Sequence, residues 1–190
     1  MGAFEHSIFD EPTGADPSAP PKSFKVAPTF LIDIAVSLLF IVAISPAWNA
    51  LIDRSLLAAL PTFLLLIPIM GCYLGKVFVI KHLDRRGGDA RTYVKSGALV
   101  TDGPYGWSRH PTYTVAMVQF FLWAALALYL QALSPWSPRL LLAAFGLPLA
   151  FFLINDLVVM PTEENMLRRL HPEEFEAYAK RTRRWFGRRG

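Results

Sequence analysis

Leu56–Ile80 reads LLAALPTFLLLIPIMGCYLGKVFVI, and this stretch decides the fold class. A helix needs about 20 mostly apolar residues to cross a bilayer, so a run of this length predicts a membrane-spanning helix. Lys76, near the end of the run, is its only charged residue. Pro61 and Pro68 are expected to bend the helix, which lipid-embedded bundles tolerate when neighbouring groups satisfy the freed carbonyls. Lipid is therefore the expected solvent for much of this chain.

Three further apolar runs extend the prediction along the chain. Together the four runs place membrane spans at about 28–48, 56–80, 112–133 and 139–160. The composition agrees, since 18% of the residues are charged, against about 25% in ordinary soluble domains. We therefore predict an all-α integral membrane protein, a bundle of about four transmembrane helices over 28–160 with a cytosolic loop. Residues 1–27 are expected to form a disordered arm, and 161–190 a cytosolic, amphipathic helical tail.

Charge placement supports an even number of spans. With four spans, the arm, the loop over 81–111 and the tail share one side, and nearly all lysines and arginines fall there. The opposite side keeps Arg54 and Arg139. The positive-inside rule then predicts that both termini are cytoplasmic. The pI of about 9.4 points to anionic lipid headgroups rather than nucleic acid as the partner, because the basic residues flank apolar segments.

Small and polar residues within the spans carry weaker signals. Gly71 and Gly75 form a small-xxx-small pair, which is typical of close helix packing and predicts either ordinary bundle packing or a homo-oligomer contact. Asp156 is expected to line a site or to pair with a cation. Cys72 is the only cysteine, and the scattered histidines predict no metal site.

Two polar segments are candidates for chemistry. Arg109 and His110 precede Pro111, a residue suited to the first position of a helix, so they are expected at the membrane mouth of the third span. Free backbone N–H groups there are expected to hold an anion. Glu163 and Glu164 follow Thr162, a potential cap for a tail helix, and their simplest role is to complement that helix dipole. His110 alone would more often be a capping residue than a catalyst.

The segments form an ordered set. Gly103-Pro104-Tyr105, Arg109-His110-Pro111-x-Tyr113, Glu163-Glu164-x-x-Leu167 and Tyr178-x-x-Arg181-x-x-Arg184-Trp185 occur in this order between about Leu99 and Trp185. This set resembles the isoprenylcysteine carboxyl methyltransferase and phospholipid methyltransferase superfamily of membrane enzymes. The first half of the chain is similar to that superfamily only in its apolar helices.

The resemblance implies methyl transfer from S-adenosylmethionine to a lipid or small lipophilic acceptor at the cytosolic membrane face, with the tail closing over the cofactor. The acceptor group, a carboxylate, thiol or amine, is left open. Arg109 is implied as the catalytic residue that orients a carboxylate or thiolate, and Glu163 as one that helps to deprotonate an amine. The residues implied to bind the cofactor are Tyr105, His110, Pro111, Tyr113, Glu164, Tyr178, Arg181 and Arg184.

The chain departs from the superfamily pattern at a few positions. Val115 stands where a small residue, often glycine, is usual, and Arg183 and Gly187 stand where proline is usual. Two other functions stay open. One is a non-catalytic membrane interaction protein, and the other is a relative of the NADPH-dependent sterol reductases, for which the chain is short.

Overall fold

The computed structural model describes residues 34–35, 37–42, 56–88, 98–133 and 137–187. The predicted arm and most of the first predicted span lie outside these residues. The described part is helical and contains no strand, in agreement with the predicted all-α class. Three of its helices are long and apolar enough to cross a membrane, namely Ala59–Arg85, Pro111–Leu133 and Pro138–Leu170.

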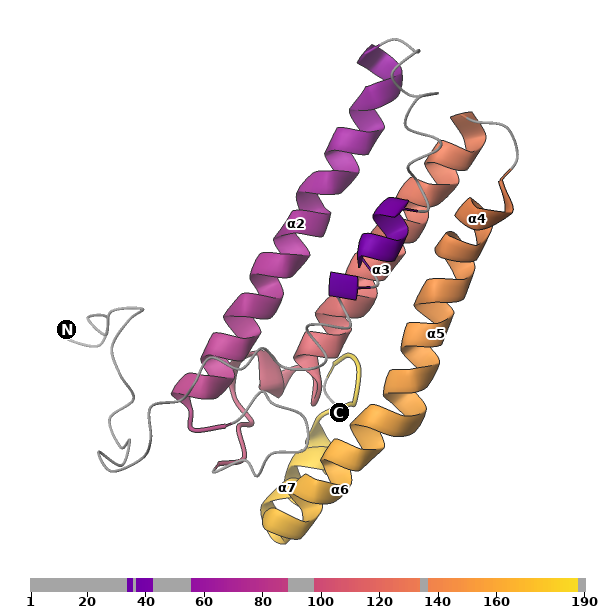
Figure 1. The fold of residues 1–190 in the computed structure, drawn as a ribbon. Coiled ribbons are helices and arrows are strands. Elements are labelled where there is room, and N and C mark those ends of the chain that lie inside the picture. Colours follow the sequence, from indigo (N-terminus) through magenta and orange to yellow (C-terminus); the bar gives the residue numbers. More distant parts are fainter. Residues whose placement is uncertain (1–33, 36, 43–55, 89–97, 134–136, 188–190) are drawn as a thin grey trace, which may run out of the picture.

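Helices α2 (Leu56–Arg85) and α3 (Pro111–Leu133) pack side by side in opposite directions (Figure 1). Pro111 begins α3 as predicted, because proline lacks the N–H that the first turn leaves unpaired. The two helices approach closely where Gly75 faces Val115, and a Cβ at Gly75 would lie 3.6 Å from Val115 Cγ1. A small residue on α2 thus accommodates the larger one on α3.

The fourth predicted span belongs to a longer helix, Pro138–Leu170, which carries the labels α4 (Pro138–Leu141), α5 (Leu147–Ile154) and α6 (Met160–Leu170). Two π-helical turns, Leu142–Gly146 and Asn155–Val159, join these parts. Pro148 and Pro161 each follow a π-turn by two residues. A proline ring clashes with the carbonyl four residues earlier, and both of those carbonyls lie inside a π-turn, whose wider winding relieves the clash.

The helix therefore does not end near Met160, and the predicted tail starts inside it. Thr162 does not cap a new helix, contrary to expectation. Its hydroxyl donates to the Val158 carbonyl oxygen at 2.7 Å within the continuous helix. The chain turns at His171 into α7 (Pro172–Arg181), which begins at a proline, a residue suited to the first turn of a helix. Phe175 and Tyr178 on α7 are buried in the protein, so they are not available to enter the membrane.

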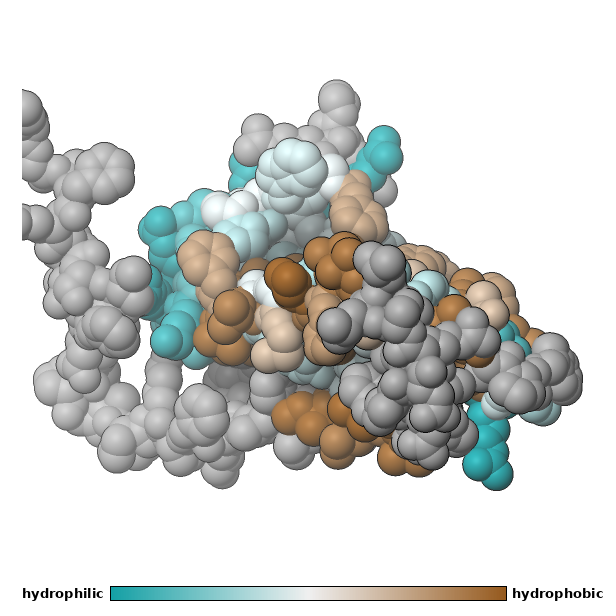
Figure 2. All heavy atoms as spheres, turned by 90° about the horizontal axis from the view of Figure 1, so that it is seen from above, coloured by the Kyte–Doolittle hydropathy of each residue, from teal (hydrophilic) through white to brown (hydrophobic). Residues whose placement is uncertain are grey.

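Helix α3 lies at the centre of the bundle. Phe120, Leu126, Ala127 and Leu130 on it are fully buried. The described residues of the first predicted span are helical and pack on α3, where Phe40 stacks on Phe120 at 6.1 Å between ring centroids. The outer faces of the other helices expose large apolar side chains, and Figure 2 shows such side chains over much of the visible bundle surface. A bilayer would cover these faces.

The end of α2, the start of α3 and the α6–α7 pair meet at one end of the bundle (Figure 1). The described ends of the middle loop and the start of the tail therefore lie at the same end of the bundle. The cytoplasmic orientation of that end stays a prediction.

Candidate functional site

A short turn anchors the loop before α3 to the end of α2. Gly103 begins the 3₁₀ turn Gly103–Gly106 with φ of 55°, and a Cβ on it would lie 2.7 Å from the His82 ring. Glycine is therefore required by both the backbone and the space. Asp102, just before the turn, pairs with Arg86 at 2.6 Å and with His82 at 3.3 Å. These contacts set the path of the chain into Arg109 and His110.

Glu164 on α6 is the hub of a buried ionic cluster. Its Oε1 accepts from Arg109 Nε at 3.1 Å, from His110 Nε2 at 3.2 Å and from Arg184 Nε at 3.1 Å. Its Oε2 accepts from Arg184 Nη2 at 3.0 Å. The Glu164 side chain is 6% exposed. One carboxylate thus gathers cations from the start of α3 and from the tail.

His110 lies between two carboxylates. Its Nδ1 is 3.3 Å from Glu163 Oε2, while its Nε2 faces Glu164. Burial alone lowers the pKa of His110, but the hydrogen bonds and charges of Glu163 and Glu164 outweigh it and raise the pKa above its ordinary value. The charged imidazole donates from both nitrogens and so fits this position. Tyr113 completes the arrangement, because its hydroxyl donates to Glu163 Oε1 at 2.7 Å.

The tail returns to the bundle as a strap, residues 182–187, that follows α7. The backbone N–H of Arg109 donates to the Arg183 carbonyl at 3.0 Å, and that of His110 donates to the Arg184 carbonyl at 3.3 Å. The hydroxyl of Thr114 donates to the Trp185 carbonyl at 2.9 Å. The backbone N–H groups of Arg109 and His110 therefore bind the strap.

Arg109 also fixes the end of α7. Its Nη1 donates to the carbonyls of Ala179 at 3.1 Å and Thr182 at 2.9 Å, the type of carbonyl that a helix end leaves without a backbone donor. The Tyr178 hydroxyl donates to the Tyr105 carbonyl at 2.6 Å. Burial raises the pKa of Tyr178 above its ordinary value, so this hydroxyl stays a donor. Each nitrogen of the Arg109 guanidinium is engaged within the protein.

Asp156 connects the cluster to the apolar part of the bundle. It lies in the π-turn Asn155–Val159, seven residues before Glu163 on the same long helix. Its Oδ1 accepts from Arg184 Nη1 at 3.3 Å and from Trp185 Nε1 at 2.9 Å. Asp156 therefore pairs with a cation, one of the two roles that the sequence suggests.

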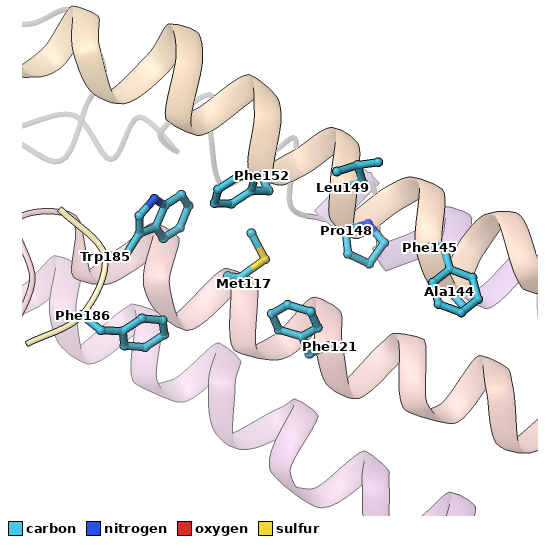
Figure 3. Close-up of a pocket in the computed structure, with 9 residues that line it drawn as sticks. All are labelled: Met117, Phe121, Ala144, Phe145, Pro148, Leu149, Phe152, Trp185 and Phe186. Atoms are coloured by element: carbon cyan, nitrogen blue, oxygen red, sulfur yellow. The ribbon is translucent and has the colours of Figure 1, made fainter.

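An apolar pocket of about 490 Å³ lies between α3, the α4–α5 part of the long helix and the strap. Figure 3 shows Trp185 and Phe186 of the strap at one end, and Ala144 and Phe145 at the other. Trp185 stacks on Phe152 of α5, with 5.3 Å between the ring centroids. One end of the pocket is thus formed by Trp185, whose indole N–H donates to Asp156.

Most of the site residues suggested by the sequence come together. The predicted site residues that take part in the hydrogen bonds described above are Tyr105, Arg109, His110, Tyr113, Glu163, Glu164, Tyr178 and Arg184. Pro111 is buried at the start of α3. Arg181 differs, since it is exposed and its guanidinium lies over the Tyr178 ring at 5.9 Å from the centroid. Val115 faces α2, so its size matters for helix packing rather than for the cluster.

Ser108 and Thr114 also belong to the site, although neither was predicted from the sequence. Their hydroxyls lie 3.1 Å apart, and Ser108 Oγ also donates to the Arg184 carbonyl at 2.9 Å. The available signal is the pair of short polar side chains on either side of Pro111, where helix starts commonly need extra hydrogen bonds. Among the described residues no group of histidine, cysteine and acidic side chains could hold a metal ion.

The comparison with protein families gives one match. Residues 29–182 match the family described as "Protein of unknown function (DUF1295)". The chain belongs to the DUF1295 family. The match covers the described helices and the cluster residues Arg109, His110, Glu163 and Glu164, while Arg184 and Trp185 of the strap lie outside it. Searches of curated proteins and of solved structures find no match.

Proposed function

We propose that this DUF1295 protein transfers a methyl group from S-adenosylmethionine to a lipophilic acceptor at one face of the membrane. The observation that carries the proposal is the meeting of the ionic cluster with the apolar pocket at Asp156, Arg184 and Trp185. A charged, water-soluble donor and a membrane-embedded acceptor need such a boundary. The resemblance of the motifs to membrane methyltransferases supports the same reaction.

The side chains of the cluster suit the cofactor chemically. Arg184 is 30% exposed and Glu163 is 18% exposed, so they are more open to solvent than the rest of the cluster around His110. Guanidinium offers a paired fit to a carboxylate, and a glutamate accepts from hydroxyl or ammonium groups. Arg184 would hold the amino-acid carboxylate of S-adenosylmethionine, and Glu163 would hold its ammonium or ribose hydroxyls. When bound, the cofactor supplies an electrophilic methyl group on a sulfonium.

The protein would contribute position and exclusion of water rather than acid–base chemistry. Methyl transfer needs an in-line approach, and holding the two reactants in place supplies much of the rate. His110 and Tyr113 orient Glu163, and Arg109 fixes the strap that brings Arg184 and Trp185 to the site. Arg109 acts here as a positioning residue. Glu163 would accept the proton if the acceptor is an amine.

A second candidate is a non-catalytic membrane protein, and the saturation of Glu164 favours it. That carboxylate already accepts hydrogen bonds from Arg109, His110 and Arg184, as expected of a purely structural cluster. The two functions differ in whether the cluster takes up a ligand. They can therefore be distinguished by binding.

The test is calorimetric titration of the detergent-purified full chain with S-adenosylmethionine, S-adenosylhomocysteine and NADPH. We expect micromolar binding of the first two, weakened at least about tenfold in Glu163→Gln, which corresponds to about 1.4 kcal/mol. Glu173→Gln, an exposed position at the start of α7, is the matched control. Binding of NADPH alone would favour a reductase, and binding of none of the three by folded protein would leave the non-catalytic function.

A further inference from the structure

The apolar pocket opens sideways toward the lipid. Met117 and Ala144 form its buried inner side, with 5% and 3% exposure. Phe121, Phe145 and Leu149 form its outer edge and are 63%, 62% and 56% exposed. These edge residues lie on helices that are long and apolar enough to cross the membrane. A molecule dissolved in the bilayer can therefore enter without passing through water.

The strap end of the pocket is lined by apolar rings, and polar side chains lie directly behind them. The Trp185 ring lines the pocket, while its indole N–H donates to Asp156, which also accepts from Arg184. A hydrocarbon chain in the pocket would thus place an attached polar head beside Arg184. The pocket is continuous with the candidate site, and its occupant is expected to be an amphiphile.

The volume limits that occupant. A dry apolar cavity of about 150 Å³ takes up one benzene ring, so the pocket volume of about 490 Å³ corresponds to roughly twenty carbon atoms. One long chain fills this volume, so two long acyl chains do not fit inside the pocket together. We propose that the pocket binds the single hydrocarbon chain of the methyl acceptor, so that the acceptor is a single-chain amphiphile rather than a diacyl phospholipid. The identification of the occupant as the acceptor rests on the proposed function.

Trp185 provides a binding signal that does not depend on catalysis. The full chain in detergent is titrated with a dibrominated single-chain carboxylate and, separately, with a dibrominated diacyl phosphatidylcholine. Trp185 is one of five tryptophans, so Trp185→Phe measures its share of the fluorescence. We expect saturable quenching of Trp185 by the single-chain probe, and at least about tenfold weaker binding of the two-chain probe.

Two variants test the location. Ala144→Phe fills the inner side and is expected to abolish the quenching, while Leu149→Phe narrows the edge without entering the core and is expected to weaken it. Leu142→Phe is the control, because Leu142 is on the same long helix, 68% exposed, and not part of the pocket lining. Equal quenching by both probes, or quenching unchanged in both pocket variants, would overturn the inference.

The outcome is separable from that of the proposed function. Selective single-chain quenching without binding of S-adenosylmethionine would keep the chain site and remove the methyltransferase. Methyl transfer whose chain-length preference is the same in the full chain and in both pocket variants would keep the enzyme and remove this pocket as the acceptor site.

Discussion

Glu164 shows how much of the site depends on a single side chain. It is 6% exposed and joins Arg109, His110 and Arg184, which come from two distant parts of the sequence. Removing one partner of a buried ion pair leaves the other charge without compensation, at a penalty of roughly 3 kcal/mol or more. Glu164 is thus expected to matter for the folded state whether or not a ligand binds.

Glu164→Gln is expected to lower the free energy of unfolding by about 3 kcal/mol, because Arg109 stays buried without its counter-ion. The measurement is thermal unfolding in detergent, together with trypsin cleavage of the strap. Glu174→Gln is the matched control, since that side chain is 74% exposed and its change is expected to stay within about 0.5 kcal/mol. Similar midpoints for both variants would contradict the role of Glu164 as the hub.

His110 is expected to make stability depend on pH. Its pKa is raised in the folded protein, so the protonated form stabilises the fold fully below about pH 6.5, the ordinary value. This contribution is lost as the pH rises through the folded-state pKa. We expect the unfolding midpoint to fall over that window and the slope to be absent in His110→Gln. Histidine NMR titration that gives a pKa at or below 6.5 would refute this prediction.

Asp156 is expected to control the pocket through Trp185. Asp156→Asn removes the charge that faces Arg184 but keeps an oxygen able to accept from the indole N–H. We therefore expect Asp156→Asn to weaken binding of S-adenosylmethionine several-fold and to leave the single-chain quenching intact. Asp156→Leu is expected to weaken both. Identical behaviour of the two variants would show that Asp156 does not act on Trp185.

At the level of the elements, the contact between α2 and α3 depends on a small residue at position 75. A methyl group there reaches Val115 Cγ1 at an ordinary contact distance of 3.6 Å, whereas a larger group does not fit. Gly75→Ala is expected to be neutral and Gly75→Leu to destabilise by about 1–3 kcal/mol, measured as the unfolding midpoint. Val115→Ala should partly restore Gly75→Leu, and no rescue would count against this contact.

Gly71 is the natural comparison, because a Cβ at that position meets nothing within 4 Å. Gly71→Leu is therefore expected to leave the single chain stable. If the predicted homo-oligomer uses this face, the same variant will change the particle mass measured by light scattering in detergent. The two glycines thus lie on different surfaces of α2: Gly75 faces α3, and a Cβ at Gly71 would point into open space.

The elements also show where sequence reasoning ends. The start of α3 at Pro111 and of α7 at Pro172 could be predicted because proline suits the first turn of a helix. The predicted cap at Thr162 was wrong, because the π-turn Asn155–Val159 lets the helix continue past Pro161. A π-turn leaves no composition signal of its own. The π-turn also decides the direction of the Asp156 side chain, so its contact with the strap could not be predicted from the sequence.

On the scale of the whole molecule, the sequence predicted which segments meet but not how they share their hydrogen bonds. The motifs placed Arg109 and His110 at the same face as Glu163 and Glu164, and the structure brings all four together. The path of the strap could not be predicted from the sequence. The strap binds the backbone N–H groups of Arg109 and His110, and its path is decided by contacts between residues 70 or more positions apart in the chain.

Removal of the strap is the sharpest test at this scale. A chain that stops after Arg181 lacks Arg184 and Trp185, so we expect it to lose binding of both S-adenosylmethionine and the single-chain probe. Its helical content by circular dichroism is expected to stay close to that of the full chain, because the spans lie upstream. Full binding by the shortened chain would mean that the strap is not part of the site.

The strap also sets the order of events during synthesis. Chains are made from the N-terminus, and the early parts fold or insert while the later parts are still being added. Helices α2 and α3 can enter the bilayer before residues 182–187 leave the ribosome. Until α6 is made the Arg109 guanidinium lacks Glu164, and until the strap is made it lacks the Thr182 carbonyl. A chain that stops before Glu164 is thus a membrane-inserted protein in which Arg109 has neither partner, a target for quality control.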